Sequence, residues 1–184
     1  MSCVRRGKNL QDELCRARLP KAQGGTNTRS ATGNRVVGFR NCGAMYQKQC
    51  RLCPFSTSNG QTVVTEVTIF HSGQIILIRQ NITCRDSNVI YILTCLKPEC
   101  RGIQYLGETG RMAYERFREH LDSAQDPNTT CPVGLHWRLP GHRLEHMQFV
   151  PFERLHCGKA ARKQREKNYI DKYDMIRQGL NVKL

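Results

Sequence analysis

Acidic residues are scarce in this chain of 184 residues, in which 15 Asp and Glu stand against 29 Lys and Arg. The resulting formal net charge is +14 at pH 7. Long apolar runs are also missing, since none approaches the ~20 residues that a membrane-spanning helix needs. No export signal is visible. We therefore expect neither a spanning helix nor a secreted protein, and the predicted setting is intracellular and reducing.

A positive charge of this size is typical of proteins that bind polyanions. The candidates are DNA, RNA and an acidic membrane surface. The alternative is that the charge only keeps the chain soluble. Charge by itself does not separate these alternatives, so the cysteines and the polar motifs must do so.

The chain contains ten cysteines. Disulfides are rare in reducing compartments, where clustered Cys and His more often bind zinc. Two clusters of Cys and His residues have the sequence spacing that is typical of metal ligands. The cysteines that lack a partner at such spacing are expected to be free thiols; they are Cys3, Cys15, Cys131 and Cys157.

The first predicted zinc site combines a C-x4-C pair with an H-x5-H pair. Cys95 and Cys100 are the thiolates, and His136 and His142 are the imidazoles. Two thiolates and two imidazoles satisfy a tetrahedral Zn²⁺. His146 competes with His142 for the fourth position, and the alternative reading is two buried cysteines with unrelated surface histidines.

The second predicted zinc site is formed by four cysteines, Cys42, Cys50, Cys53 and Cys84. The C-x2-C spacing at Cys50 and Cys53 folds readily around zinc. His71 is an alternative fourth ligand, although we expect it at a hairpin tip. Four-ligand sites leave no open position for a substrate, so both zinc ions are assigned to folding.

Composition divides the chain into three segments. Residues 1–41 are expected to be a flexible basic arm with a weak helical tendency at 9–17. Residues 42–87 are expected to form a cysteine-rich hairpin module. Residues 88–184 are expected to be the main domain, an α+β fold with a small antiparallel three-stranded sheet flanked by helices.

Hydrophobic periodicity places the expected elements. In the hairpin module, two strands flank a turn at residues 71–73; they are 62–70 and 74–79. In the main domain the expected strands are 89–95, 103–107 and 147–152. A helix over 111–124, capped by Thr109, carries the apolar stripe Ala113, Phe117, Leu121 and Ala124. A last helix is expected from residue 159 to residue 177, stopped by Gly179.

Five polar residues of the main domain are candidates for chemistry. Tyr91 and Tyr105 lie on neighbouring strands, where they can face the same side. Arg116 and His120 share one face of the following helix because they are four residues apart. Glu166 falls on the buried stripe of the last helix, where a carboxylate is costly without a cation. A partly exposed Glu166 paired with Lys or Arg is the alternative.

These motifs resemble the GIY-YIG nuclease domain. The segments that carry the resemblance are Val89-Ile90-Tyr91, Tyr105-Leu106-Gly107, Arg116 to His120, Arg165 to Ile170 and Gly179-Leu180-Asn181. Val89 replaces the glycine of the family name, and Leu106 replaces its isoleucine. The endonuclease domain of Penelope-like retroelements is more similar still, since it too carries a cysteine pair between the tyrosine motifs and a histidine pair downstream.

The resemblance implies a metal-dependent DNA endonuclease of nuclear location. Glu166 would hold Mg²⁺ or Mn²⁺, and Tyr91 would orient or deprotonate the attacking water. Arg116 would bind the scissile phosphate, whereas Tyr105 and His120 would position phosphate or water. Asn181 would brace the site. The nick would leave a 3′-hydroxyl that a reverse transcriptase, in the same polyprotein and on its RNA template, could extend.

Basic residues around this centre are expected to contact the DNA backbone; they are Arg111, Arg138, Arg143, Lys163 and Arg165, with Lys159 and Arg162 as further candidates. Two alternatives stay open. One is a zinc module that binds nucleic acid without cleaving it, and the other is a repair or homing nuclease of the same fold. Whether Trp137 touches DNA or packs in the core is also open.

Overall fold

The computed structural model describes residues 36–42, 50–56 and 63–182. The expected arm up to residue 35, with its weak helix at 9–17, lies outside these residues. In chain order the described elements are β1 (Phe39–Arg40), the 3₁₀ helix η2 (Cys53–Phe55), β2 (Val63–Val64), β3 (Glu66–Ile69), β4 (Gln74–Leu77), β5 (Ile82–Thr83), β6 (Val89–Cys95), the 3₁₀ helix η3 (Pro98–Cys100), β7 (Gln104–Thr109), α2 (Ala113–Gln125), α3 (Pro132–Trp137), the 3₁₀ helix η4 (Leu144–His146), β8 (Met147–Arg154), α4 (Lys159–Lys172) and α5 (Met175–Gln178).

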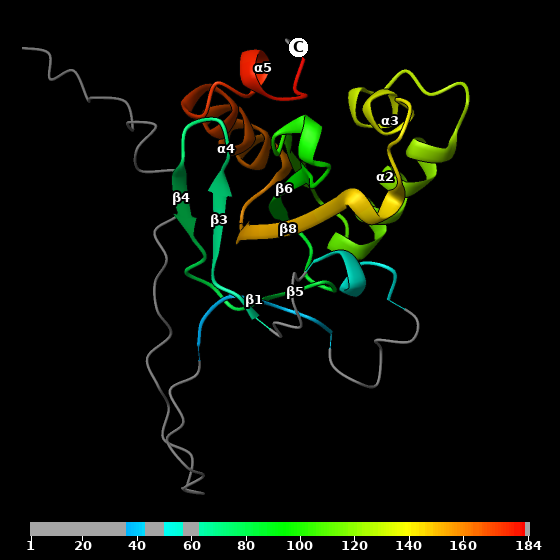
Figure 1. The fold of residues 1–184 in the computed structure, drawn as a ribbon. Helices are drawn as coiled ribbons and strands as arrows, with labels where there is room; N and C mark the ends of the chain where they lie inside the picture. The colour runs from blue at the N-terminus through cyan, green and yellow to red at the C-terminus, as the bar shows by residue number, and fades with distance from the viewer. Residues whose placement is uncertain (1–35, 43–49, 57–62, 183–184) are drawn as a thin grey trace, which may run out of the picture. The chain divides into compact units, whose positions relative to one another are not determined.

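The centre of the fold is an antiparallel sheet with the strand order β7-β6-β8. All seven residues of β6 are buried, so both faces of the sheet are covered. Helices α4 and α5 contact β7, and α2 packs its Phe117 against Phe149 of β8. In Figure 1, β6 lies between α4 and α5 on one side and α2 and α3 on the other. The expected α+β class and the three-stranded antiparallel sheet are therefore confirmed.

Strands β3 and β4 form the expected hairpin, paired from Glu66 with Leu77 to Ile69 with Gln74. The buried side chain of Gln104 ties this hairpin to the central sheet. Its Oε1 accepts a hydrogen bond from Phe70 N at 3.1 Å, and its Nε2 donates to Thr68 O at 2.9 Å. The hairpin is thus fixed against β7 rather than left as two isolated strands, which would be marginally stable.

A small second sheet has the order β2-β1-β5, with β1 antiparallel to β2 and parallel to β5. Strand β1 falls within residues 1–41, the range expected to be an arm. Its Phe39 is fully buried, so the end of that range belongs to the packed part of the protein. The sequence offers little warning, because a two-residue strand has no readable alternation.

Helix α2 carries the predicted stripe, and all four of its stripe residues are buried. Its start differs from the expectation. The helix begins at Ala113, and Glu115 Oε2 accepts a hydrogen bond from Met112 N at 3.2 Å. Thr109 Oγ1 instead accepts from Arg111 N at 3.0 Å, so Thr109 closes the turn before the helix.

The helix expected from residue 159 to residue 177 is two helices. It breaks between α4 and α5 at Asp174, whose φ of 46° is left-handed. The break lets both neighbours of Asp174 reach the core, because Tyr173 is 6% exposed and Met175 is fully buried. Gly179 follows α5 directly, as expected. Helix α3 was not predicted, since six residues carry too little periodicity. None of the described helices is both long and apolar enough to span a membrane.

Candidate active site and metal centres

Tyr91, Arg116 and His120 meet at the junction of β6 and α2. The Tyr91 hydroxyl lies 2.9 Å from Arg116 Nε and 2.8 Å from His120 Nε2. A guanidinium can only donate, so the Tyr91 hydroxyl accepts from Arg116, and it shares a second hydrogen bond with His120 Nε2. The predicted shared face of Arg116 and His120 therefore converges on Tyr91.

Tyr91 is fully buried in this arrangement. Its ring stacks on Phe149 at a centroid distance of 4.4 Å and lies 6.4 Å from the ring of Tyr105. Gly107, opposite Tyr91 in the sheet, leaves room for the hydroxyl, because a Cβ there would lie 2.5 Å from the Tyr91 oxygen. Tyr105 is only partly buried, so of the two tyrosines it has the more open side chain.

Glu166 approaches the same centre from α4. Its Oε1 accepts a hydrogen bond from Glu108 N at 3.1 Å. Glu108 lies next to Gly107, the residue paired with Tyr91 in the sheet, so the carboxylate lies beside the strand that carries Tyr105. The other oxygen, Oε2, has no hydrogen-bond partner among the described residues. Glu166 is half-buried, and it lines a hollow of about 410 Å³ together with Lys163 and Lys167.

Asn181 fixes the strand that carries Tyr105. Its Oδ1 accepts from Leu106 N at 2.9 Å, and its Nδ2 donates to Leu106 O at 2.7 Å. Asn181 is buried, and β7 is an edge strand whose outer backbone groups would otherwise be unpaired. The side chain thus acts as a substitute for a neighbouring strand between Tyr105 and Gly107.

Burial governs the protonation of this centre. It raises the pKa of Tyr91 well above its ordinary value, although Arg116 acts in the opposite direction. Burial, followed by the charge of Arg116, lowers the pKa of His120 to about 3. Burial and the neighbouring Glu108 raise the pKa of Glu166. The resting centre therefore has a neutral phenol and a neutral imidazole.

The first predicted metal group assembles as proposed. The ligand atoms of Cys95, Cys100, His136 and His142 all lie within 4.8 Å of one another. His136 Nε2 is buried and has no hydrogen-bond partner, which suits an atom that binds a metal ion. His142 Nε2 lies 3.0 Å from Cys100 Sγ, while its Nδ1 lies 3.2 Å from Leu139 O, so Nε2 is the nitrogen directed at the other ligands.

His146, the competing ligand for this group, points elsewhere. Its Nδ1 accepts a hydrogen bond from Arg143 N at 3.1 Å, and it is not among the clustered ligands. The structure therefore favours His142 over His146. Trp137, next to His136, is 4% exposed and packs its ring against that imidazole at 4.9 Å. Its role is in the core.

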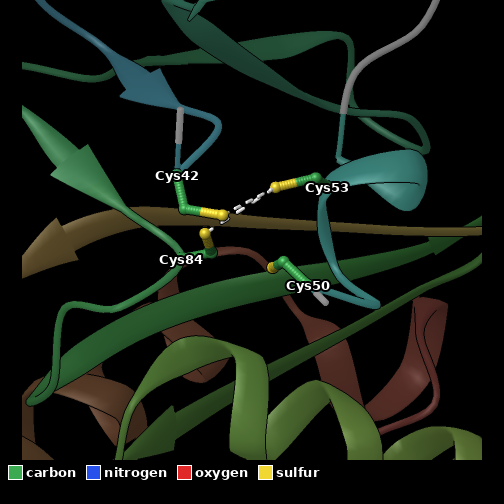
Figure 2. Close-up of side chains that lie close together, drawn as sticks. All are labelled: Cys42, Cys50, Cys53 and Cys84. Carbon is green, nitrogen blue, oxygen red and sulfur yellow. Dashed lines mark hydrogen bonds between the residues drawn. The ribbon is translucent and has the colours of Figure 1, made fainter. Parts of the chain in front are cut away.

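The second predicted group also comes together, and Figure 2 shows its four thiol groups directed at one another. Cys42 Sγ lies 3.3 Å from Cys53 Sγ, which lies 3.8 Å from Cys84 Sγ. Burial raises the pKa of Cys53 to about 12, whereas hydrogen bonds to Cys53 and Cys84 lower the pKa of Cys50 despite its burial. Four thiols held this close could bind a zinc ion. His71 is exposed on the hairpin turn and is not part of the group.

The predicted DNA-contacting residues are exposed, but most of them already have partners. Arg111 pairs with Glu119, Arg143 with Glu145 at 2.8 Å, and Arg165 with Glu153 at 2.9 Å. Arg138 donates to Pro127 O. Lys163 has no ion-pair partner among the described residues. These contacts are at the surface, where ion pairs contribute little and exchange readily.

Sequence reasoning missed the roles of two residues, Glu119 and Arg162. Glu119 holds Arg116 at 2.8 Å and also pairs with Arg111. Arg162, considered as a phosphate contact, is instead buried and pairs with Glu108. A Glu three residues after Arg116 was readable as a helical ion pair. A buried Arg on a helix rich in basic residues leaves no such signal.

The comparisons with known proteins agree with this geometry. Neither the curated proteins nor the solved structures gave a match. The family model described as the GIY-YIG catalytic domain matches residues 87–181. That segment is more than half of the chain, and it contains both tyrosines, Arg116, His120, Glu166 and Asn181. The chain therefore belongs to the GIY-YIG family, a family of nucleases.

Proposed function

We propose that this protein is a metal-dependent DNA endonuclease that nicks its target. One observation carries the proposal: Arg116 of α2 donates to the Tyr91 hydroxyl of β6, while Glu166 of α4 accepts from the backbone of Glu108 on the neighbouring strand β7. Hydrolysis of a phosphodiester needs an oriented water, neutralisation of the phosphoryl charge and protonation of the leaving oxygen. The residues at this centre supply a matching group for each requirement.

Glu166 is the residue that would hold Mg²⁺ or Mn²⁺. Its Oε2 has no hydrogen-bond partner among the described residues, and a half-exposed carboxylate oxygen is the ligand that such hard ions prefer. When bound, the ion would supply Lewis-acid stabilisation of the phosphoryl oxygens. The two sulfur-containing groups are suited to zinc instead, and we assign them to folding.

The protein's own groups would then carry out the remaining steps. Arg116 uses Nε and Nη1 for Tyr91 and Glu119, which leaves Nη2 for the scissile phosphate. Tyr91 would orient the water or take its proton while passing its own proton to His120. The water oxygen bonds to phosphorus, the P–O3′ bond breaks, and the 3′ oxygen takes a proton from a solvent water. The proton passed to His120 is returned to solvent after the products leave. The products are a 5′-phosphate and a 3′-hydroxyl.

The finer proposal is that the 3′-hydroxyl primes reverse transcription, as in Penelope-like retroelements. Its support is the cysteine pair between the tyrosine motifs and the histidine pair downstream, which the fold gathers into one group. A reverse transcriptase, its RNA template and the target DNA are the partners that this role implies, in the nucleus. A repair or homing nuclease is the alternative within the same fold.

Plasmid nicking tests the proposal. Wild-type protein, Arg116→Ala and Glu166→Ala are compared in Mg²⁺ or Mn²⁺, and both variants should be at least ~10²-fold slower. Arg118→Ala is the matched control, because Arg118 lies on the exposed face of the same helix α2. Equal nicking by all four proteins would reject the site. Binding of DNA without nicking by any of them would instead favour the non-catalytic zinc module.

Extension of the nick separates the finer alternatives. A reverse transcriptase added with an RNA template should extend the nicked strand directly if the product ends in a 3′-hydroxyl. Incision that depends on DNA damage or a branched substrate would favour a repair nuclease over the retroelement role.

A further inference from the structure

Helix α4 buries an arginine against the central sheet. Arg162 is 6% exposed, and Tyr169 and Ile170 of the same helix are only partly buried. A buried guanidinium is costly unless its donors are satisfied. Arg162 Nε makes a very short contact with Glu108 Oε2, and Arg162 Nη1 donates to Asn88 Oδ1 at 2.8 Å. The arginine is therefore held between β7 and the residue that precedes β6.

Arg162 and Glu166 hold the same residue of β7. They are four residues apart, so they share one face of α4. Arg162 forms an ion pair with the side chain of Glu108, while Glu166 Oε1 accepts a hydrogen bond from the backbone N–H of Glu108. One turn of α4 thus contacts Glu108 at two points. This double contact sets both the rotation and the register of α4 against the strand that also carries Tyr105.

The contact between Arg162 and Glu108 also affects the charge beside Glu166. Arg162 and Glu166 are one turn apart on α4 and both contact Glu108, so a second carboxylate that a cation could bind lies beside Glu166. Arg162 neutralises Glu108 and occupies one of its oxygens. The space for this arginine comes from Gly110, where a Cβ would lie 2.7 Å from Arg162 Nη2. A larger residue there would displace the guanidinium.

We propose that Arg162 is a positioning residue that acts through Glu108 to align Glu166 for the divalent metal ion and to keep Glu108 from competing for it. The inference rests on the proposed nuclease function. It does not make Arg162 a group that touches DNA or the metal. Removal of Arg162 should therefore have its largest effect on metal affinity.

The test measures Mn²⁺ binding directly, from the signal of free Mn²⁺ in electron paramagnetic resonance, and the half-saturating Mn²⁺ for nicking. Arg162→Gln should weaken Mn²⁺ binding at least ~10-fold, while DNA binding without metal stays within about twofold of wild type. Arg154→Gln is the matched control. It breaks another ion pair, Arg154 with Asp86 at 2.6 Å, which includes no residue of α4.

A second variant guards against misfolding of Arg162→Gln. Asn88→Gly removes only the second partner of Arg162, and glycine accepts the left-handed φ of 57° at this position. We expect it to weaken Mn²⁺ binding about threefold. Unchanged Mn²⁺ affinity in a folded Arg162→Gln protein, or in Asn88→Gly if Arg162→Gln does not fold, would overturn the inference.

The wild-type protein distinguishes this failure from failure of the proposed function. If wild type neither nicks DNA nor binds more Mn²⁺ than Glu166→Ala, the nuclease proposal fails together with the inference. If wild type does both and Arg162→Gln matches it, only the role of Arg162 is rejected.

Discussion

The hydroxyl group of Tyr91 lies 2.8 Å from Nε2 of His120 in a buried contact. Arg116 donates a hydrogen bond to the same hydroxyl group. The pair is neutral at rest because burial raises the pKa of Tyr91 and lowers that of His120. Because His120 is neutral in the folded protein, it should make the free energy of unfolding depend on pH.

Stability should fall as pH drops below about 6.5, partly through His120. The unfolded chain binds a proton on this residue near pH 6.5, whereas the folded protein does so only near its pKa of about 3. Between these values the unfolded state holds more protons, so unfolding becomes easier by up to about 1.4 kcal/mol per pH unit. Denaturant unfolding of wild type and His120→Gln at pH 7, 6 and 5 measures this.

The free energy of unfolding should be larger for wild type than for His120→Gln at pH 7, and this difference should become smaller as the pH falls. The glutamine does not titrate, and other groups such as His136, whose pKa burial lowers to about 4, change equally in both proteins. Parallel stability curves from pH 7 to pH 5 would contradict a buried neutral His120.

Gly107→Ala should damage the site more than the fold. The new methyl group would lie 2.5 Å from the Tyr91 oxygen and 2.8 Å from Tyr105 Cε1, so both phenol groups must move. Misplacement of reacting groups by about 1 Å can cost ~10²-fold in rate. We expect nicking to fall by about that factor, with a loss of stability of roughly 1–3 kcal/mol from overpacking.

Gly158→Ala is the control for this substitution, since no atom lies within 4 Å of a Cβ built there. It should nick at the wild-type rate. Wild-type nicking by Gly107→Ala would mean that the position of the Tyr91 hydroxyl is not critical.

The same residues explain how far the sequence can predict the site. The stripe of α2 was readable because Ala113, Phe117 and Leu121 repeat at helical spacing, and that spacing places Arg116 and His120 together. The separation of the cysteine and histidine pairs was readable because metal ligands restrict both residue type and spacing. Each of these signals is local in the chain or restricted by chemistry.

The features that could not be predicted from the sequence depend on contacts between residues that are far apart in the chain. The burial of Arg162 follows from the position of Glu108, 54 residues away, which no periodicity encodes. The break at Asp174 is equally hidden, because it follows from the burial of Tyr173 and Met175 in a core built by other segments. Full burial of Tyr91 likewise depends on Phe149 of β8. The position of Tyr91 on its strand was therefore easier to predict than the burial of its side chain.

Zinc removal should destabilise the protein, and the two groups can be separated. Elemental analysis is expected to give about two zinc ions per chain, and Cys95→Ser should lose one of them. Structural zinc contributes ~10 kcal/mol or more to folding in small peptides. In a protein of this size, the loss of even a few kcal/mol should lower the melting temperature by about 10 °C.

Cys157→Ser is the control for the zinc measurement, because Cys157 belongs to neither group of clustered ligands. It should keep both ions and the wild-type melting temperature. A zinc content of zero in wild type, or no loss of zinc in Cys95→Ser, would reject the assignment of the first group.

Lys163 should contribute to DNA affinity through its charge alone. It lines the hollow beside Glu166, and it has no ion-pair partner among the described residues, so it is ready to meet a phosphate. Each phosphate contact releases counterions and adds about 0.9 to the slope of log affinity against log salt. Lys163→Ala should therefore weaken binding of unrelated DNA sequences equally and reduce that slope by about 0.9. Titrations in 50–200 mM salt measure it, with exposed Arg118→Ala as the control; an unchanged slope would place the DNA path away from α4.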